Sequence, residues 1–185
     1  MAMRNRLLLA VSLLAASLLS VACPSISGPS TLKTYTGQYS VQVVESTVTV
    51  SLQGGGTFPC TNTYTMSGTV TLKVDQATGG ESSAIVDGTQ TETAHSTGDS
   101  CKAKGNLTTK WSPKLNVSGS DLSFDDQHVA TNGGYGVTSR VTFAGTLSNG
   151  VVTGALGLSV SGSGVIGGTA SVSQNYSTTV NVTLR

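Results

Sequence analysis

The residues of this chain best suited to chemistry are two histidines and the acidic side chains near them. His128 follows Asp125 and Asp126, and Asp121 lies a few positions earlier. Carboxylate oxygens of this kind are calcium ligands, but the spacing lacks the glycine and the distal glutamate of an EF-hand loop. We therefore interpret this cluster as a solvated turn between strands, and we expect no metal site.

The second histidine, His95, lies in a threonine-rich stretch with Glu92 and Asp99 nearby. Serines are so abundant that a Ser-His-Asp arrangement can be drawn around almost any position, and no Gly-x-Ser-x-Gly elbow is present. Adjacent carboxylates such as Asp125 and Asp126 point to opposite faces of a strand, which weakens a glycosidase-type pair. We therefore expect no catalytic residue and no cofactor, with a secreted hydrolase as an alternative.

The three cysteines give a third kind of chemistry. No Cys-x-x-Cys motif is present and no cysteine lies beside a histidine, so neither zinc binding nor thiol catalysis is indicated. Cys60 and Cys101 lie in the strand-rich part and are expected to form a disulfide in an oxidising compartment. Closing a loop of about 40 residues stabilises a fold by roughly 3 to 4 kcal/mol. Free buried thiols are the alternative, and Cys23 is left over.

Residues 1–22 have the pattern of a secretory signal peptide. Arg4 and Arg6 precede an apolar run, Leu7 to Leu19, which ends in small residues before Cys23. A membrane-spanning helix needs about 20 apolar residues, and this run is shorter. The sequence therefore predicts export, and the leader takes no part in the fold.

The segment Leu19-Ser20-Val21-Ala22-Cys23 resembles the lipobox of bacterial lipoproteins, with Ser20 where that family usually has leucine. The resemblance implies that Cys23 becomes the first mature residue and carries a lipid, which would also explain the odd cysteine. The protein would then be attached through Cys23 to the outer membrane or cell surface. Residues 23–32, with two prolines, would form a flexible tether. Ordinary cleavage, giving a periplasmic or secreted protein, is the alternative.

The mature chain is almost neutral. Two of the ten basic residues lie in the leader and none of the nine acidic ones does, so the mature charge is 8 minus 9, or −1. Such a charge does not indicate a nucleic-acid partner or an anionic membrane surface. Only 10% of residues are charged, and the many glycines, serines, threonines and valines favour strands and turns. Residues 33–185 are expected to form one domain.

The strongest fold signal is the Asn149-Gly150 pair, which lies between two runs of alternating apolar and polar residues. Both residues tolerate positive φ, so they favour a two-residue hairpin turn. That turn fixes a register in which apolar residues face apolar residues. The expected pairs are Leu147 with Val152, Phe143 with Leu156, and Val141 with Leu158.

Similar alternation continues elsewhere and predicts an all-β fold: a single antiparallel, meander-rich β-barrel or β-sandwich of about 8–10 strands. A change of phase predicts a bulge or turn at Val44 to Ser46, with Glu45 in solvent. Residues 87–100 are expected to form a weak edge strand and a loop. A turn is predicted at Ser161 to Gly164, and a break or bulge at Gln174 to Thr178.

A barrel of this size can hold one small apolar molecule. Gly37-Gln38-Tyr39 resembles the Gly-x-Trp opening of lipocalin-like barrels, with Tyr39 in place of the tryptophan. The resemblance implies a calycin-like barrel, and Tyr35, Tyr39, Trp111 and Phe143 are candidates to line its cavity. Packing of these aromatic residues in an ordinary core is the alternative.

Taken together, these patterns favour an exported, lipid-anchored envelope protein that is not an enzyme. We expect a surface-interaction or structural role in which it contacts an envelope protein or polymer. A barrel that binds a small apolar ligand is the first alternative, and a secreted hydrolase is the second. A cavity would favour the former, and a close pair of catalytic groups in a cleft the latter.

Overall fold

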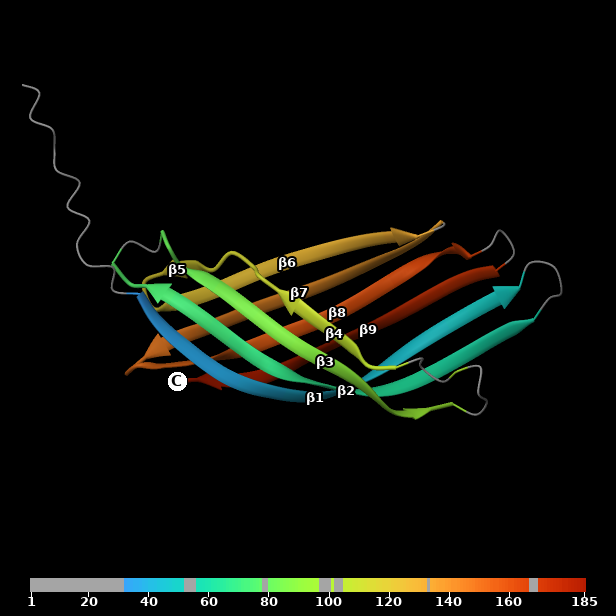
Figure 1. Ribbon diagram of the computed structural model, residues 1–185, viewed down its shortest axis with the longest axis horizontal. Coiled ribbons are helices and arrows are strands. Elements are labelled where there is room, and N and C mark those ends of the chain that lie inside the picture. The colour runs from blue at the N-terminus through green and yellow to red at the C-terminus, as the bar shows by residue number, and fades with distance from the viewer. Residues whose placement is uncertain are drawn as a thin grey trace, which may run out of the picture. The chain divides into compact units, whose positions relative to one another are not determined.

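The computed structural model describes residues 32–51, 56–77, 80–96, 101, 105–132, 134–166 and 170–185. They form one antiparallel sheet that curls into a half-barrel (Figure 1). The leader, Cys23 and most of the expected tether lie outside these residues. In the described part of the chain, no helix is long and apolar enough to cross a membrane. The predicted all-β class is confirmed, and the architecture is barrel-like.

The sheet has nine strands in the order β4-β3-β2-β1-β9-β8-β7-β6-β5. Strands that follow one another in sequence are neighbours, except where β1 pairs with β9, and β4 and β5 form the two edges. Two meanders, β1 to β4 and β5 to β9, are therefore joined side by side. The strands are β1 (Leu32–Ser51), β2 (Thr57–Asp75), β3 (Ser83–His95), β4 (Leu107–Trp111), β5 (Asn116–Ser118), β6 (Asp121–Asn132), β7 (Tyr135–Ser148), β8 (Val151–Ile166) and β9 (Ala170–Leu184).

The hairpin of β7 and β8 has the predicted turn and register. Asn149 and Gly150 have φ values of 51° and 74°, as a two-residue turn of this kind requires. All three predicted apolar pairs are present. Their side chains lie on the concave face of the sheet, where the described core is found.

Apolar packing closes one end of the half-barrel. Phe124 of β6 stacks on Phe143 of β7 with ring centroids 5.4 Å apart. The side chains that are almost fully buried come from both meanders, so the concave face is folded onto itself at this end. They are Val70, Leu72, Val74, Val86, Leu122, Val141, Val152, Leu156 and Leu184.

The predicted bulge at Val44 to Ser46 is wrong. β1 is one strand whose register with β2 is continuous from Leu32 to Val50. The alternation that begins at Tyr35, in which odd-numbered residues face the core, therefore continues. For this reason Val44 is 56% exposed, while Glu45 lies on the concave side opposite Asn62. The mistake arose because valines occupy both faces here, and only one of those faces is core.

Other predicted interruptions are also wrong. Residues 125–128 lie in the middle of β6 and form no turn. β3 continues to His95, and it pairs with β2 along this length but with β4 only from Val86 to Gln90, so its last residues form an edge, as expected. The expected loop at residues 97–100 lies outside the described residues. β8 passes through Ser161 to Gly164, and β9 passes through Gln174 to Thr178, without a register shift. These segments consist mainly of small or polar residues, which look like turns in a sequence but pair normally as strands once neighbours flank them.

The segment that contains β4 and β5 changes partner along its length. Leu107 to Trp111 pairs with β3, whereas Asn116 to Ser118 pairs with β6. If the register between β5 and β6 is continued toward the N-terminus of the segment, Trp111 lies opposite His128. The two rings are in edge contact, with centroids 4.5 Å apart. No backbone pairing joins β4 to β6 in the described strands. The seam of the half-barrel is thus closed at β5 and open at β4.

Two facing glycines allow Tyr39 to lie across the concave face. Tyr39 is paired with Gly68, which is paired with Gly88, and the tyrosine hydroxyl reaches Gly88. A methyl group on Gly68 would collide with the backbone oxygen of Asp87, which cannot move without disrupting the ladder. The close approach of these strands therefore requires glycine.

We predict that Gly68→Ala lowers the free energy of unfolding by roughly 1 to 3 kcal/mol, the usual cost of overpacking. Urea unfolding measures this. Gly136→Ala is the matched control, because its new methyl group would meet only Thr131 Cγ2 at 3.8 Å. Equal stabilities of the two variants would contradict the close approach at Gly68.

Candidate functional site

A cavity of about 180 Å³ lies on the concave face, on the open side of the seam. Strands from both meanders contribute its wall, so the cavity exists only because the sheet is curled. Apolar and aromatic side chains make up much of the lining, with one carboxylic acid among them. These residues include Glu45, Met66, Leu107, Trp111, Leu158 and Tyr176.

Beyond the cavity, a bulge in β3 brings polar side chains onto the same face. The register between β2 and β3 shifts at Thr63 and Tyr64, so Thr93 is an extra residue. Glu92 is paired with Tyr64, and His95 with Asn62. An extra residue reverses the alternation of the strand. For this reason Glu92 and His95, three positions apart, both lie on the concave side.

A short chain of hydrogen bonds orients Glu45. Asn62 Nδ2 donates to the Tyr64 hydroxyl at 3.1 Å, and that hydroxyl in turn donates to the Glu45 carboxylate. The side chains of Asn62 and Tyr64 are buried, with 8% and 7% exposed. Asn62 Oδ1 is buried without a hydrogen-bond partner. The carboxylate is therefore held by a buried support.

Burial controls the ionisation of these groups. Burial raises the pKa of Glu45 above that of an ordinary carboxyl group, although the Tyr64 hydrogen bond partly offsets the effect. Burial, with smaller contributions from Glu45, Tyr39 and Tyr64, raises the pKa of Tyr176 to about 12. Burial also raises the pKa of Tyr64. Tyr64 and Tyr176 are therefore neutral at pH 7, and Tyr176 lines the cavity as a neutral phenol.

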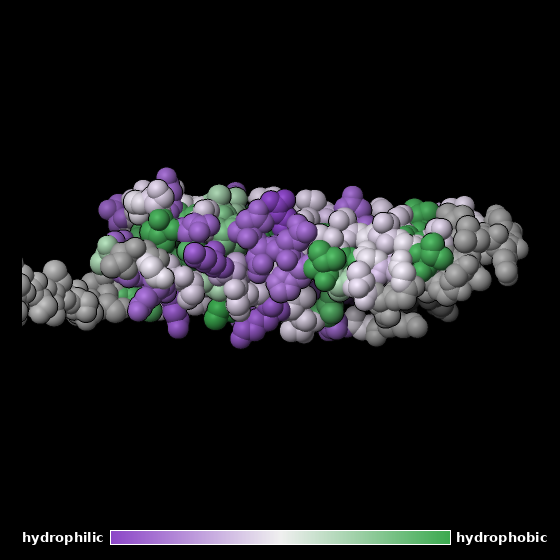
Figure 2. Space-filling model, turned by 90° about the horizontal axis from the view of Figure 1, so that it is seen from above, coloured by the Kyte–Doolittle hydropathy of each residue, from purple (hydrophilic) through white to green (hydrophobic). Residues whose placement is uncertain are grey.

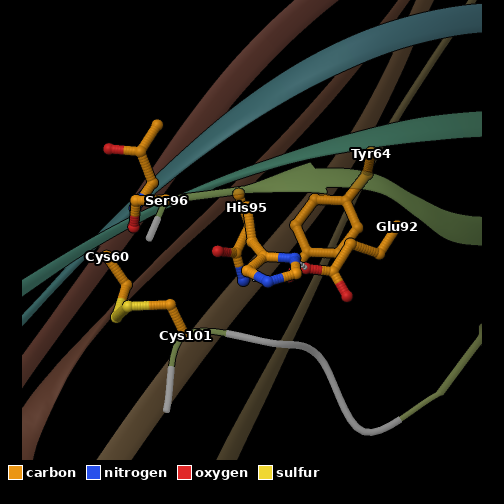
Figure 3. Close-up of a disulfide and its surroundings, with 8 residues drawn as sticks. Cys60, Tyr64, Glu92, His95, Ser96 and Cys101 are labelled. Carbon is orange, nitrogen blue, oxygen red and sulfur yellow. Dashed lines mark hydrogen bonds and ion pairs between the residues drawn. A yellow bond between two sulfur atoms is a disulfide. The ribbon is translucent and has the colours of Figure 1, made fainter. Parts of the chain in front are cut away.

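The disulfide lies beside the Glu92–His95 pair. Cys60 and Cys101 are bonded, as predicted, with Cα atoms 5.3 Å apart. Figure 3 shows Tyr64, Glu92 and His95 together next to this bond. Glu92 Oε1 lies 3.3 Å from His95 Nδ1, and the Glu92 side chain is only 13% exposed. The disulfide thus holds Cys101 next to this polar group.

The predicted cluster around His128 is divided between the two faces of β6. Asp126 Oδ2 lies 3.2 Å from His128 Nε2, on the concave side at the seam. Asp125 lies on the other face, where it accepts two hydrogen bonds from Arg140, and this pairing lowers its pKa. Asp121 is exposed at the start of β6. Figure 2 shows the molecule from the side on which β6 lies in Figure 1. Hydrophilic side chains gather near the middle of this face, and hydrophobic groups lie around them.

The four aromatic residues singled out as cavity candidates have different surroundings. Trp111 lines the cavity. Tyr35 and Phe143 are buried in the apolar core, and Tyr39 crosses the glycine pair on β2 and β3. The sequence reasoning did not identify Glu45, Tyr64 or Tyr176 as site residues. Glu45 continues the alternation in which odd-numbered residues of β1 face the core, so the sequence pattern could have placed it on the concave side.

Within the described residues, no group of three or more His, Cys, Asp or Glu side chains is close enough to hold a metal ion. A scan against protein-family models, and searches of curated proteins and of solved structures, found no match.

We predict that Glu45→Gln makes the protein more stable at pH 7. Because the pKa of Glu45 is raised, the folded protein binds this proton more tightly than the unfolded chain. The stability linked to Glu45 is therefore complete below the ordinary carboxyl pKa and is lost as pH rises through the raised pKa. Glutamine keeps the Tyr64 hydrogen bond and removes this loss.

Urea unfolding at several pH values, from about pH 4 to pH 8, would test this. The gain in the unfolding free energy should be greatest near neutral pH and should disappear below the ordinary carboxyl pKa. Glu81→Gln, the same change at an exposed site, should leave stability unchanged. A Glu45→Gln protein that is less stable at pH 7 would show that the ionised carboxylate is stabilising.

Proposed function

We propose that the protein is an exported envelope protein that binds a small ligand in the concave cavity and performs no catalysis. The observation that supports this most is the cavity itself, in which an apolar and aromatic wall surrounds a few polar groups. Binding sites for small molecules commonly have this composition. The sequence favoured a surface-contact role, whereas the cavity favours ligand binding.

The size of the cavity limits the ligand. A cavity of about 150 Å³ is enough to bind benzene, and this one has about 180 Å³. Drug-sized ligands occupy about 300 Å³ or more. The ligand we propose therefore has the bulk of one ring or a short aliphatic chain, and it reaches the cavity through the open part of the seam.

The arrangement of the histidines favours binding over hydrolysis. In the described structure each histidine pairs with a carboxylate, His95 with Glu92 and His128 with Asp126. The described hydrogen bonds join neither ring to a serine. A nucleophile activated by a base requires that contact.

We also propose that the protein is anchored through a lipid on Cys23. The lipobox-like junction supports this, and so does the disulfide, because pairing of Cys60 with Cys101 leaves Cys23 as the odd cysteine. Acylation would use that thiol. The cavity-bearing domain would then be held at the outer membrane or the cell surface.

The cavity should bind a single-ring probe. Trp111 is the only tryptophan of the chain and lines the cavity, so its fluorescence reports on occupancy. We expect benzyl alcohol to change this fluorescence in a saturable manner. Val137→Phe, which places a ring in the cavity, should weaken binding by about tenfold or more, equivalent to about 1.4 kcal/mol.

Val129→Phe is the matched control, because Val129 is 63% exposed and does not line the cavity. It should bind the probe as the native protein does. An unsaturable response, or equal weakening by both variants, would rule out the cavity as the binding site.

The anchor is tested by the intact mass of the mature protein from native membrane and supernatant fractions. We expect a membrane-associated species that begins at Cys23 and carries a diacylglyceryl group. Its mass should rise by two hydrogens on reduction, because one disulfide is opened. An unmodified soluble chain would contradict the anchor and leave the cavity proposal unaffected.

A further inference from the structure

We propose that the ligand is an organic cation, an ammonium group attached to an apolar body of about one ring. This inference rests on the proposed function, because it assigns a chemical class to the ligand of the same cavity. The observation that supports it is that a carboxylate and two aromatic side chains line the same cavity. These are Glu45, Trp111 and Tyr176.

Glu45 has no cationic partner among the described ion pairs, which use Glu92, Asp125 and Asp126 instead. A carboxylate withdrawn from water without a positive partner is costly, and its pKa rises for that reason. A bound ammonium group would supply the missing charge. Binding would then lower the pKa of Glu45, so cation binding and loss of the proton favour each other.

The buried support leaves the carboxylate able to accept further hydrogen bonds. Tyr64 donates one hydrogen bond to Glu45, whereas an ionised carboxylate has about four acceptor positions. Asn62 does not reduce that capacity, because its amide nitrogen donates to Tyr64. A donor-rich ligand matches this environment.

Aromatic side chains complete the environment for a cation. Trp111 from β4 and Tyr176 from β9 both line the cavity. A cation over an aromatic face is attracted by the negative face of the ring, and tryptophan gives the strongest effect. The same rings offer apolar contact to the body of the ligand, so the cavity lining suits both parts of an aromatic amine.

The other charged groups around the cavity do not compete for the ligand. Arg140 also borders the cavity, but its guanidinium pairs with Asp125 on the opposite face of the sheet. Glu92, paired with Tyr64 in the register, adds negative charge on the β3 side, where His95 accompanies it. The tyrosine hydroxyls of Tyr64 and Tyr176 are neutral at pH 7.

A metal ion is the other cation that two carboxylates could attract. Glu45, Glu92 and His95 do not form a metal-binding group, since the described residues contain no cluster of three such ligands. A single carboxylate with aromatic neighbours suits an organic ammonium group better than calcium, which takes six to eight oxygen ligands.

The test compares three single-ring probes of similar size and different charge: benzylammonium, benzyl alcohol and benzoate. Titrations followed by Trp111 fluorescence at pH 7.5 should rank them in that order of affinity, with benzylammonium at least about tenfold tighter than benzyl alcohol. Affinity for benzylammonium should fall as the pH is lowered through the pKa of Glu45, and affinity for benzyl alcohol should not.

Glu45→Gln should remove the preference for benzylammonium and leave benzyl alcohol binding unchanged, while the exposed control Glu81→Gln should keep the preference. Benzyl alcohol binding that equals or exceeds benzylammonium binding would overturn the cation inference and leave the proposed cavity function standing. Failure of all three probes to bind would instead overturn the proposed function. Unfolding curves for each variant show that losses of binding are not losses of fold.

Discussion

In the described strands, pairing of β1 with β9 joins the two meanders along a shared strand edge, and the concave face depends on it. Ser46 to Ser51 pair with Ala170 to Asn175, and Thr36 exchanges backbone hydrogen bonds with Arg185 at 2.9 and 3.1 Å. Each meander alone, of four or five strands, would expose one apolar face to water. Glu45 reaches the cavity from the first meander and Tyr176 from the second, so the site is a product of this pairing.

The two ends of the concave face satisfy different physical demands. At one end, packed rings and aliphatic side chains exclude water, and this region supplies most of the burial that stabilises the fold. At the other end, a buried asparagine oxygen and a carboxylate with a raised pKa oppose folding. Unfavourable groups of this kind are typical of sites where function, not stability, determines the residue. The disulfide closes a loop across this less stable end, where chain entropy would otherwise favour opening.

Much of the fold could be predicted from period-two alternation, because only one face of most strands is buried. The hairpin at Asn149-Gly150 and its register followed from turn chemistry alone. The interruptions inside β6, β8 and β9 were predicted wrongly, because aspartate, glycine and serine favour turns locally while sheet neighbours determine their conformation here. The site was harder to predict, since it depends on long-range pairing and on the bulge at Thr93. No local pattern around Glu92 and His95 signals that both lie on the same face.

The direction of the first strand has a consequence for how the domain is presented. β1 begins at Leu32 beside the apolar end, where Thr36 meets Arg185, and its far end at Ser51 lies toward the polar end. A chain attached before Leu32 therefore approaches the closed end. Nine extended residues reach at most about 30 Å, so a lipid on Cys23 would hold the closed end near the membrane. The cavity, which Glu45 lines far along β1 from Leu32, would then lie on the part of the domain that is farther from the bilayer.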